Sequence, residues 1–248
     1  MFLLWEIVKK NFSSKYKDSF LGILWTILNP LLMLALFTII FSTLFHNNIV
    51  NYPLYFLSGW CIITFFNGVI GASMSTLKNN KNILQRTPAP KHIFVLGSII
   101  SESLNFIIML IILAIVMIVT QAPFYWLTIP FSIIPLISLF VMVTGLGLIF
   151  SIICVYYSDI QYLWTVVSML FIYASGVFYP MEIIPEPYHQ ILILNPIFWV
   201  INQFRCFVYQ GIFPQPVFML NLVLLSLIIL IFGIIIFKKY ENKVVMKF

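Results

Sequence analysis

Long apolar stretches alternate with short polar segments along the whole chain. A helix needs about 20 predominantly apolar residues to cross the hydrocarbon core of a membrane. Six stretches are near or above that length, and turns rich in Asn, Pro or charged residues separate them. We therefore predict an all-α membrane protein with six transmembrane helices. The predicted spans are Leu21–Phe45, Leu54–Leu77, Ile93–Thr120, Leu127–Val155, Tyr162–Tyr179 and Val217–Phe237.

The segment between the last two predicted spans, residues 180–216, is apolar but interrupted. Its best apolar run, Ile191–Ile201, is broken by Asn195-Pro196 and is too short to span a membrane. A seventh span would also place the basic C-terminal tail outside the cell. We expect residues 180–216 to form re-entrant outer helices before the last span, shielded by protein or by a water-filled cavity.

Residues 1–20 precede the first span and repeat apolar side chains with a helical period. Glu6, Lys10 and Lys17 lie on the opposite side of such a helix. This pattern predicts an amphipathic helix that lies in the inner membrane interface. The apolar stretch after Lys17 is too long for the core of a cleavable signal peptide. The apolar positions are Phe2, Trp5, Val8, Phe12 and Tyr16.

Composition excludes a soluble fold. Hydrophobic residues make up 62% of the chain and charged residues 8%, and the mean hydropathy is +1.08. Soluble domains carry about 25% charged residues, and this chain has too few charges to cover a water-exposed surface. We expect residues 1–248 to form a single transmembrane domain.

Twelve of the thirteen Lys and Arg residues fall into three clusters. Basic loops stay on the cytoplasmic side of a membrane, so both termini and residues 78–91 are predicted to be cytoplasmic. Because these cations mark topology, the net charge of +6 does not indicate a nucleic-acid partner. The clusters are Lys9, Lys10, Lys15 and Lys17; Lys78, Lys81, Arg86 and Lys91; and Lys238, Lys239, Lys243 and Lys247.

The sequence carries no recognisable catalytic or metal-binding motif. HExxH, GxSxG and Walker A patterns are absent, the three histidines lie in three different loops, and the three cysteines form no CxxC pair. We predict no catalytic residue, no metal site and no cofactor on this chain. Glu102 is the only carboxylate well inside a predicted span, and one carboxylate makes a poor ion relay. Energy for uphill transport would have to come from a partner.

Three separated motifs appear in order along the chain. The first runs from Lys15 to Trp25 and continues through Asn29-Pro30, and the second is residues 157–161, with sequence YSDIQ. The third combines Tyr179-Pro180, Pro185, Asn195-Pro196 and Arg205. Together they resemble the membrane subunit of type-2 ABC exporters, in the branch that exports polysaccharides and polyol-phosphate polymers such as O-antigen, capsule and teichoic acid. Ser158 departs from the family pattern, which usually has Arg at that place.

The resemblance implies a permease subunit of an ATP-driven exporter in the bacterial cytoplasmic (inner) membrane. It would move a lipid-linked polysaccharide or a teichoic-acid-like polymer. The chain would work as a homodimer with two ATP-binding ABC subunits. ATP and Mg would be bound by those partners, so this subunit would not itself be an enzyme.

The resemblance also implies roles for particular residues. Residues 78–91 would form the cytoplasmic coupling loop, with a short helix over Lys78–Gln85, and residues 180–216 the outer gate segment. Coupling to the ATPase would use Lys78, Lys81, Arg86, Lys91 and Asp159. The outer gate would use Pro180, Pro185, Asn195, Pro196 and Arg205.

Aromatic residues make up 17% of the chain. Sugar rings present apolar C–H faces that stack on aromatic rings, so an aromatic channel would let a polymer slide without tight binding. Aromatic side chains also pack between helices and anchor them at interfaces. The predicted channel-lining residues are Trp25, Trp60, Phe65, Phe66, Tyr173, Phe178 and Tyr179.

Three alternatives remain open at the level of sequence. A type-2 ABC permease for a drug, a lipid or a peptide would have the same fold. An ion-coupled carrier would depend on Glu102 and on an ion gradient, and a membrane-embedded enzyme would turn over substrate without a partner. Gly68, Gly71, Gly145 and Gly147 are assigned to helix packing only.

Overall fold

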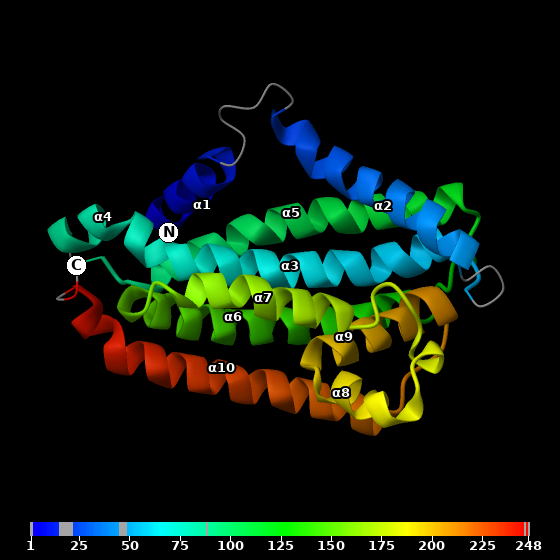
Figure 1. The fold of residues 1–248 in the computed structure, drawn as a ribbon. Helices are drawn as coiled ribbons and strands as arrows, with labels where there is room; N and C mark the ends of the chain where they lie inside the picture. Colours follow the sequence, from blue (N-terminus) through cyan, green and yellow to red (C-terminus); the bar gives the residue numbers. More distant parts are fainter. Residues whose placement is uncertain (1, 15–21, 45–48, 88, 246, 248) are drawn as a thin grey trace.

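The computed structural model describes residues 2–14, 22–44, 49–87, 89–245 and 247. All regular elements in these ranges are helices, which confirms the predicted all-α class (Figure 1). The elements are α1 (Phe2–Ser14), η1 (Gly22–Leu24), α2 (Trp25–Leu44), α3 (Tyr52–Asn79), α4 (Lys81–Arg86), α5 (His92–Val119), η2 (Ile129–Ser132), α6 (Ile133–Tyr156), α7 (Ile160–Tyr173), η3 (Met181–Ile183), η4 (Glu186–Tyr188), α8 (His189–Leu194), α9 (Pro196–Arg205), η5 (Cys206–Gln210) and α10 (Pro216–Val245).

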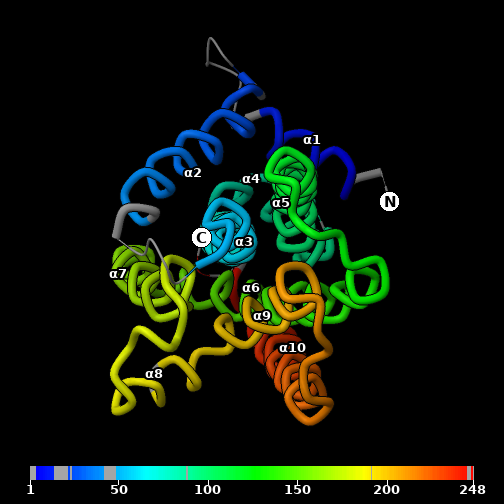
Figure 2. The backbone as a smooth tube through the Cα atoms, turned by 90° about the vertical axis from the view of Figure 1, so that its right-hand side faces the viewer, coloured from blue at the N-terminus to red at the C-terminus, as the bar shows by residue number. Residues whose placement is uncertain are grey.

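Helix α3 forms the centre of the bundle (Figure 2). It packs against α5 and α6, and α6 packs against α10 in the most extensive helix contact of the described chain. The start of α3 is sharply defined, because the side chain of Asn51 accepts a hydrogen bond from the backbone N–H of Leu54 at 3.4 Å. Asn51 has a φ of 57°, a left-handed conformation that Asn tolerates better than most residues.

Four of the six predicted spans are confirmed as helices with the length and apolar character needed to cross a membrane. They are Tyr52–Asn79, His92–Val119, Ile129–Tyr156 and Pro216–Val244. The first predicted span corresponds to α2, whose described apolar part is the shorter stretch Trp25–Phe41. The fifth corresponds to α7.

The prediction for the fifth span is wrong about its end. Helix α7 has 14 residues and stops at Tyr173 instead of Tyr179. It is about 21 Å long at about 1.5 Å per residue, against a hydrocarbon core of about 30 Å. The chain turns after Tyr173 because Gly176 adopts a φ of 63°, which a helix does not allow.

Helix α2 runs obliquely across the bundle (Figure 1), and near its end Phe37 and Phe41 contact Phe56 and Tyr52 of α3. Pro30 lies inside this helix. Much of α2 is covered by exposed apolar side chains, including Leu28, Leu32 and Leu36. Such a surface is compatible with lipid or with another protein chain.

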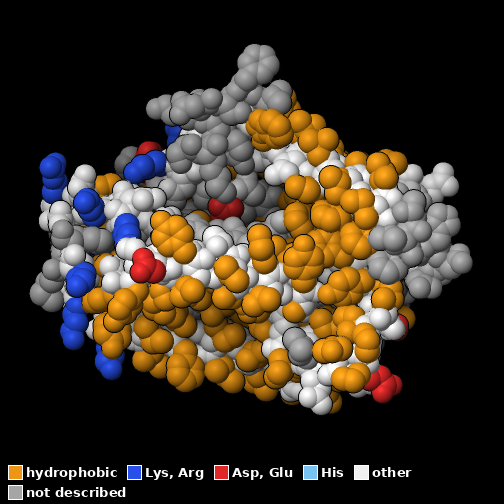
Figure 3. Space-filling view, viewed as in Figure 1, with side chains coloured by type: hydrophobic (Ala, Val, Ile, Leu, Met, Phe, Trp, Pro, Cys, Tyr) orange, Lys and Arg blue, Asp and Glu red, His pale blue; other side chains and the backbone are white. Residues whose placement is uncertain are grey.

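The two termini and α4 lie at one end of the molecule, and α8 and α9 lie toward the other (Figure 1). Lys and Arg side chains gather at the end with α4, and hydrophobic side chains cover most of the adjoining surface in the same view (Figure 3). The basic residues of α4 and those near the end of α10 therefore lie at the same end of the molecule (Figure 1).

Close contacts between helices depend on glycine at a few positions. A Cβ atom on Gly145 of α6 would lie 2.5 Å from the carbonyl oxygen of Ile229 on α10. A Cβ atom on Gly233 of α10 would overlap with the carbonyl oxygen of Gly145. The two backbones are in direct contact here, as small residues allow in membrane helix pairs.

Candidate functional site

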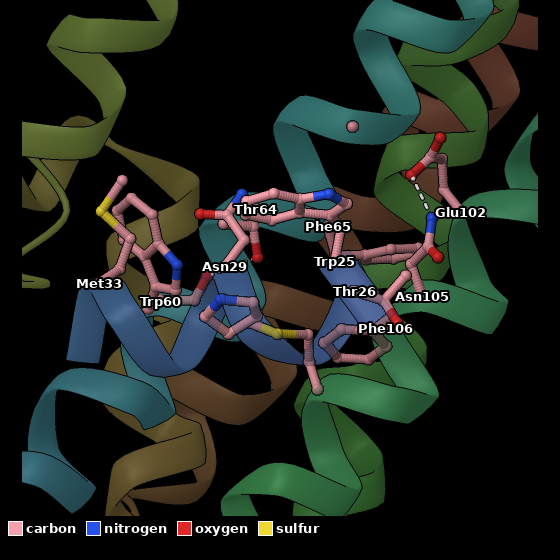
Figure 4. A pocket seen from close by; sticks show the side chains of 13 residues that line it. Trp25, Thr26, Asn29, Met33, Trp60, Thr64, Phe65, Glu102, Asn105 and Phe106 are labelled. Carbon is pink, nitrogen blue, oxygen red and sulfur yellow. Dashed lines mark hydrogen bonds between the residues drawn. The ribbon is translucent and has the colours of Figure 1, made fainter. Parts of the chain in front are cut away.

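A cavity of about 410 Å³ lies between the first half of α2 and the middle of α3 and α5 (Figure 4). Its aromatic wall consists of Trp25, Trp60, Phe65 and Phe106. Its polar wall consists of Thr26, Asn29, Thr64, Glu102 and Asn105. The cavity thus brings three predicted channel-lining residues together with Glu102, the carboxylate that the sequence placed inside a span.

Glu102 is 7% exposed and projects from α5. The side-chain amide of Asn105, one turn later, donates a hydrogen bond to Glu102 Oε2 at 3.2 Å (Figure 4). Gly68 of α3 leaves room for this carboxylate, since a Cβ atom there would lie 3.0 Å from Oε2. Burying a carboxylate in a membrane protein carries a large desolvation cost, so such a residue usually has a specific role.

A row of aromatic side chains continues from this cavity toward the N-terminal end of α3. The ring centroids of Trp60 and Phe56 are 5.4 Å apart, and those of Phe56 and Phe178 are 5.9 Å apart. Phe178 also stacks on Phe41, with centroids 5.8 Å apart. The members of this aromatic row are Trp60, Phe56, Phe37, Phe178, Phe41 and Tyr52.

Arg205, one of the predicted gate residues, lies in α9 and is 6% exposed. Its guanidinium group donates hydrogen bonds to the carbonyl oxygens of Tyr55, Gly176 and Val177 at 2.7–3.1 Å. It also donates to Ser58 Oγ at 3.3 Å. A buried cation requires hydrogen-bond acceptors around it, and these four bonds hold α9, α3 and the turn after α7 together.

The predicted break at Asn195-Pro196 is present, and the helices on its two sides are bent by 97°. The side chain of Asn195 accepts a hydrogen bond from Ile197 N–H at 2.9 Å and thereby caps α9. Its amide donates to the carbonyl oxygen of Ala174 at 3.0 Å and to Ser175 Oγ at 2.8 Å. The bend in the outer segment is therefore joined to the same turn that Arg205 contacts.

At the end of the molecule with α4, the predicted short helix is displaced along the chain. Lys78 belongs to the last turn of α3, and the short helix is Lys81–Arg86 instead of Lys78–Gln85. Asn80 separates the two helices as their shared cap. Lys78 Nζ donates to Ser158 Oγ at 2.7 Å, which connects the end of α3 to the turn that carries Asp159.

A second cavity of about 690 Å³ lies on this face, between α4, the start of α5 and the end of α10. Arg86, Lys91 and Glu241 are among its lining residues. Lys91 Nζ donates to Asn242 Oδ1 at 3.2 Å, so the C-terminal helix forms part of this face.

Other predicted channel residues lie away from the first cavity. Phe66 is 1% exposed and packs on Trp164 and Phe171. Tyr173 is 61% exposed, and its carbonyl oxygen accepts a hydrogen bond from the hydroxyl of Tyr179. Burial raises the pKa of the Tyr179 hydroxyl, and the nearby Tyr173 raises it further by a smaller amount. The Tyr179 hydroxyl therefore stays protonated and remains a donor at neutral pH.

The remaining predicted residues fall on the outer segment and on α1. Pro180 and Pro185 directly precede η3 and η4. Trp5 on α1 is 63% exposed and Phe12 is partly buried, while Tyr16 lies outside the described residues. Helix α1 packs against α5, where Ile7 lies against Gly97, and both Ile7 and Val8 are buried.

Sequence reasoning missed the residues that complete these sites. Tyr55 and Ser58 lie one turn apart on α3, yet no pattern in the sequence connects them with Arg205. Asn105 follows Glu102 by three residues, a spacing that places both on one helix face and could have been noticed. Over the described ranges, no group of three or more His, Cys, Asp or Glu side chains gathers to hold a metal ion.

The comparisons with known proteins agree on one family. A family model described as ABC-2 type transporter matches residues 3–209. Relatives described as O-antigen export system permease protein RfbA include one from Myxococcus xanthus, 26% identical over 92% of this chain and 88% of that protein. Another, from Klebsiella pneumoniae, is 27% identical over 97% of this chain and 93% of that protein. The polysialic acid transport protein KpsM of Escherichia coli is 24% identical over 90% of this chain and 87% of that protein.

Proposed function

Because this chain belongs to the ABC-2 type transporter family, we propose that it is the permease subunit of an ATP-driven polysaccharide exporter. The observation that carries this proposal is the likeness to O-antigen and polysialic acid export proteins over at least 90% of the chain. The exported molecule is a lipid-linked polysaccharide or a similar polymer that crosses the cytoplasmic membrane. The chain performs no covalent chemistry.

The aromatic row supports a polymer as the substrate. Aromatic faces offer contact with the C–H faces of successive sugar rings and demand no particular hydrogen-bond pattern. The row begins at the cavity beside Trp60 and ends near Tyr52 at the outer end of α3. In the proposed path, the polymer follows this direction, and the outer segment of residues 180–216 opens and closes the exit.

The proposed membrane arrangement has six crossings, with α2 and α7 completing the set formed by α3, α5, α6 and α10. Helices α8 and α9 re-enter from the outer side, and α1 lies along the inner interface. Both termini are cytoplasmic, which is supported by the basic end of the molecule (Figure 3). A re-entrant segment requires shielded backbone, and the bonds of Asn195 and Arg205 supply part of that shielding.

The proposed assembly is a homodimer with two ATP-binding ABC subunits, which hold ATP and Mg. Helix α4 and its flanking residues Lys78 and Lys91 dock on the ATPase. The motion of the ATPase reaches the helix bundle through the end of α3 and through the hydrogen bond from Lys78 to Ser158. The two copies then separate along their shared interface and open the channel.

The proposal is tested by purifying the tagged chain from its own cells in mild detergent and identifying its partners by mass spectrometry. We expect a stoichiometric ATPase with a Walker A motif. In vesicles, the purified complex should then move a fluorescent lipid-linked oligosaccharide only when ATP is present. A folded, dimeric chain that reproducibly lacks an ATPase would favour an ion-coupled carrier or an enzyme instead.

A further inference from the structure

A further cavity of about 510 Å³, the outer cavity, lies where the outer segment meets the start of α3. The start of α3 and helix α9 are at the end of the molecule opposite α4 (Figure 1). Three parts of the chain supply its walls: Tyr55 on α3, Pro180 and Glu182 at η3, and Tyr209 and Gln210 on η5. Its volume falls within the range of about 300–1,000 Å³ typical of pockets for small molecules, so it can hold a sugar ring.

The outer cavity directly follows the aromatic row. The row ends at Tyr52, whose ring centroid is 6.4 Å from that of Tyr55. Tyr55 in turn meets Tyr209 edge to face, with centroids 5.7 Å apart. A ring that leaves the end of the row therefore reaches the outer cavity next, without a gap in the aromatic surface.

Both tyrosines of the outer cavity are held in place before any ligand arrives. The Tyr55 hydroxyl donates a hydrogen bond to the carbonyl oxygen of Gly176 at 3.2 Å, and the Tyr209 hydroxyl donates to the carbonyl oxygen of Val50. Each hydroxyl oxygen can still accept a hydrogen bond. The aromatic wall is thus preorganised, which lowers the entropic cost of binding.

The backbone that carries Tyr209 and Gln210 is unusual. These residues end η5, a π-helical turn that directly follows α9, and the turn stops at Gly211 with a φ of 68°. Such turns are rare and are frequently found at functional sites. The widened turn places Tyr209 and Gln210 on the wall of the outer cavity.

The polar groups of the outer cavity suit hydroxyl groups. Glu182 and Gln210 are both exposed. A carboxylate accepts several hydrogen bonds, and an amide both donates and accepts, so the pair can bind neighbouring hydroxyls of one ring. The aromatic row before the cavity consists mostly of Phe and Trp rings and offers few such partners.

The charges around the outer cavity favour an uncharged ligand. An acidic ring would meet the carboxylate of Glu182. A basic ring would approach the guanidinium group of Arg205, whose carbon lies 3.5 Å from the centroid of the Tyr55 ring. Because Arg205 is buried, its charge is poorly screened.

We propose that the outer cavity is an exit subsite that binds one ring of a neutral, hydroxyl-rich sugar. The ring lies against Tyr209, and its hydroxyls bind Glu182 and Gln210. This inference rests on the proposed function, because the ring belongs to the exported polymer. It adds a second contact after the aromatic row, made jointly by α3 and the outer segment, and narrows the substrate to polymers of neutral sugars.

The first experiment is isothermal titration calorimetry on the full chain in lipid nanodiscs. The probes are neutral trisaccharides of glucose, mannose and galactose, with a sialic acid trimer as the acidic comparison. We expect at least one neutral trisaccharide to bind at least about tenfold more tightly than the sialic acid trimer. Glu182→Ala should weaken that binding at least about tenfold and Gln210→Ala about threefold, because hydrogen bonds to a charged group are the stronger ones.

Glu186→Ala is the matched control. Glu186 is likewise an exposed carboxylate of the outer segment, and it opens η4 outside the outer cavity. This variant should keep the wild-type affinity. Melting temperatures identify any variant that fails to fold, and Gln210→Ala tests the site independently of Glu182→Ala.

A labelling experiment locates the bound sugar. The three native cysteines are buried, so a membrane-impermeant maleimide reports on a cysteine introduced at the surface. Ile183 lines the outer cavity, and Tyr188 is exposed outside it. A saturating neutral trisaccharide should slow labelling of Ile183→Cys and leave labelling of Tyr188→Cys unchanged.

Four results would overturn the inference. These are no binding of any neutral trisaccharide, equal affinity for the sialic acid trimer, equal affinities of Glu182→Ala and Glu186→Ala, and unprotected Ile183→Cys. Co-purification of an ATPase is scored on the same preparation. If the ATPase is present while these tests fail, the exit subsite is wrong and the exporter function stands; if the ATPase is absent, the exporter function fails separately.

Discussion

The guanidinium carbon of Arg205 lies 3.5 Å from the centroid of the Tyr55 ring, and the two residues are 150 positions apart in the sequence. The ring and four hydrogen-bond acceptors surround a cation that is almost entirely buried. A desolvated cation over an aromatic face gains about 2 kcal/mol. This contact fixes the outer segment to the central helix of the bundle.

Arg205→Lys should therefore destabilise the protein. A lysine ammonium has three donors on a flexible chain and cannot reproduce the planar fork that reaches acceptors on two sides. We expect a loss of about 3 kcal/mol, since several bonds to a buried charge are removed together. The loss would be measured as a lower melting temperature in detergent.

The matched control for this substitution is Arg86→Lys. Arg86 is the chain's other arginine and is exposed at the end of α4. The change there should leave the melting temperature nearly unchanged. Equal melting temperatures of the two variants would contradict the structural role of Arg205.

Asn195 and Pro196 should differ in their contributions to the outer segment. Asn195→Ala removes the cap of α9 and both bonds to the turn after α7, and should cost about 1–2 kcal/mol. Pro196→Ala keeps all three bonds and should leave assembly intact while it alters export. Thermal unfolding and vesicle transport would be measured on both variants. Normal export by Pro196→Ala would contradict a gating role for the bend.

Reversing the charge of the coupling region should weaken binding of the ATPase. In the triple variant Lys78→Glu, Lys81→Glu and Arg86→Glu, the basic surface around α4 becomes acidic. The hydrogen bond that Lys78 donates to Ser158 is lost. We expect at least about a tenfold loss of co-purified ATPase, because a like-charge contact at an interface costs several kcal/mol. Membrane insertion should be unaffected.

The control for this variant reverses the same number of charges in the C-terminal cluster, at Lys239, Lys243 and Lys247. It changes the net charge equally but leaves α4 intact. Unchanged recruitment of the ATPase by the α4 variant, or equal loss in both variants, would rule out a specific docking role for α4.

The sequence predicted the parts of this fold that follow from local pattern. The lengths of the apolar stretches located four spans. The Asn195-Pro196 pair located the bend, because the helical conformation is disfavoured for a residue that precedes proline. The end of α7 was missed because residues 174–179 are as apolar as a span, and only the turn at Gly176 shows where the helix stops.

Long-range contacts could not be predicted in the same way. The aromatic composition suggested a channel, but three of the seven predicted residues line the cavity while Phe66 is packed inside the bundle. The partners of Arg205 depend on how α3 and α9 meet, which apolar periodicity does not encode. Glu102 was noticed as a rare intramembrane carboxylate, but its setting among aromatic rings required the structure.

The contact between α6 and α10 gives a further prediction about stability. The sequence assigned Gly145 to packing but did not identify Gly233 as its partner. A methyl group on Gly145 would press on the backbone of Ile229 and Leu230, at 2.5–2.7 Å, and a backbone cannot rotate away as a side chain can. Gly145→Ala should therefore cost about 1–3 kcal/mol, the usual effect of overpacking.

Gly71→Ala provides the matched control. Gly71 lies in α3, and a Cβ atom there would meet nothing within 4 Å. Replacing an unconstrained helical glycine by alanine stabilises by about 0.5–1 kcal/mol, so the two substitutions should shift the melting temperature in opposite directions. Gly233→Ala should behave like Gly145→Ala, because its Cβ would meet the backbone of Gly145. If Gly145→Ala melted at or above the temperature of Gly71→Ala, the close approach of α6 and α10 would be refuted.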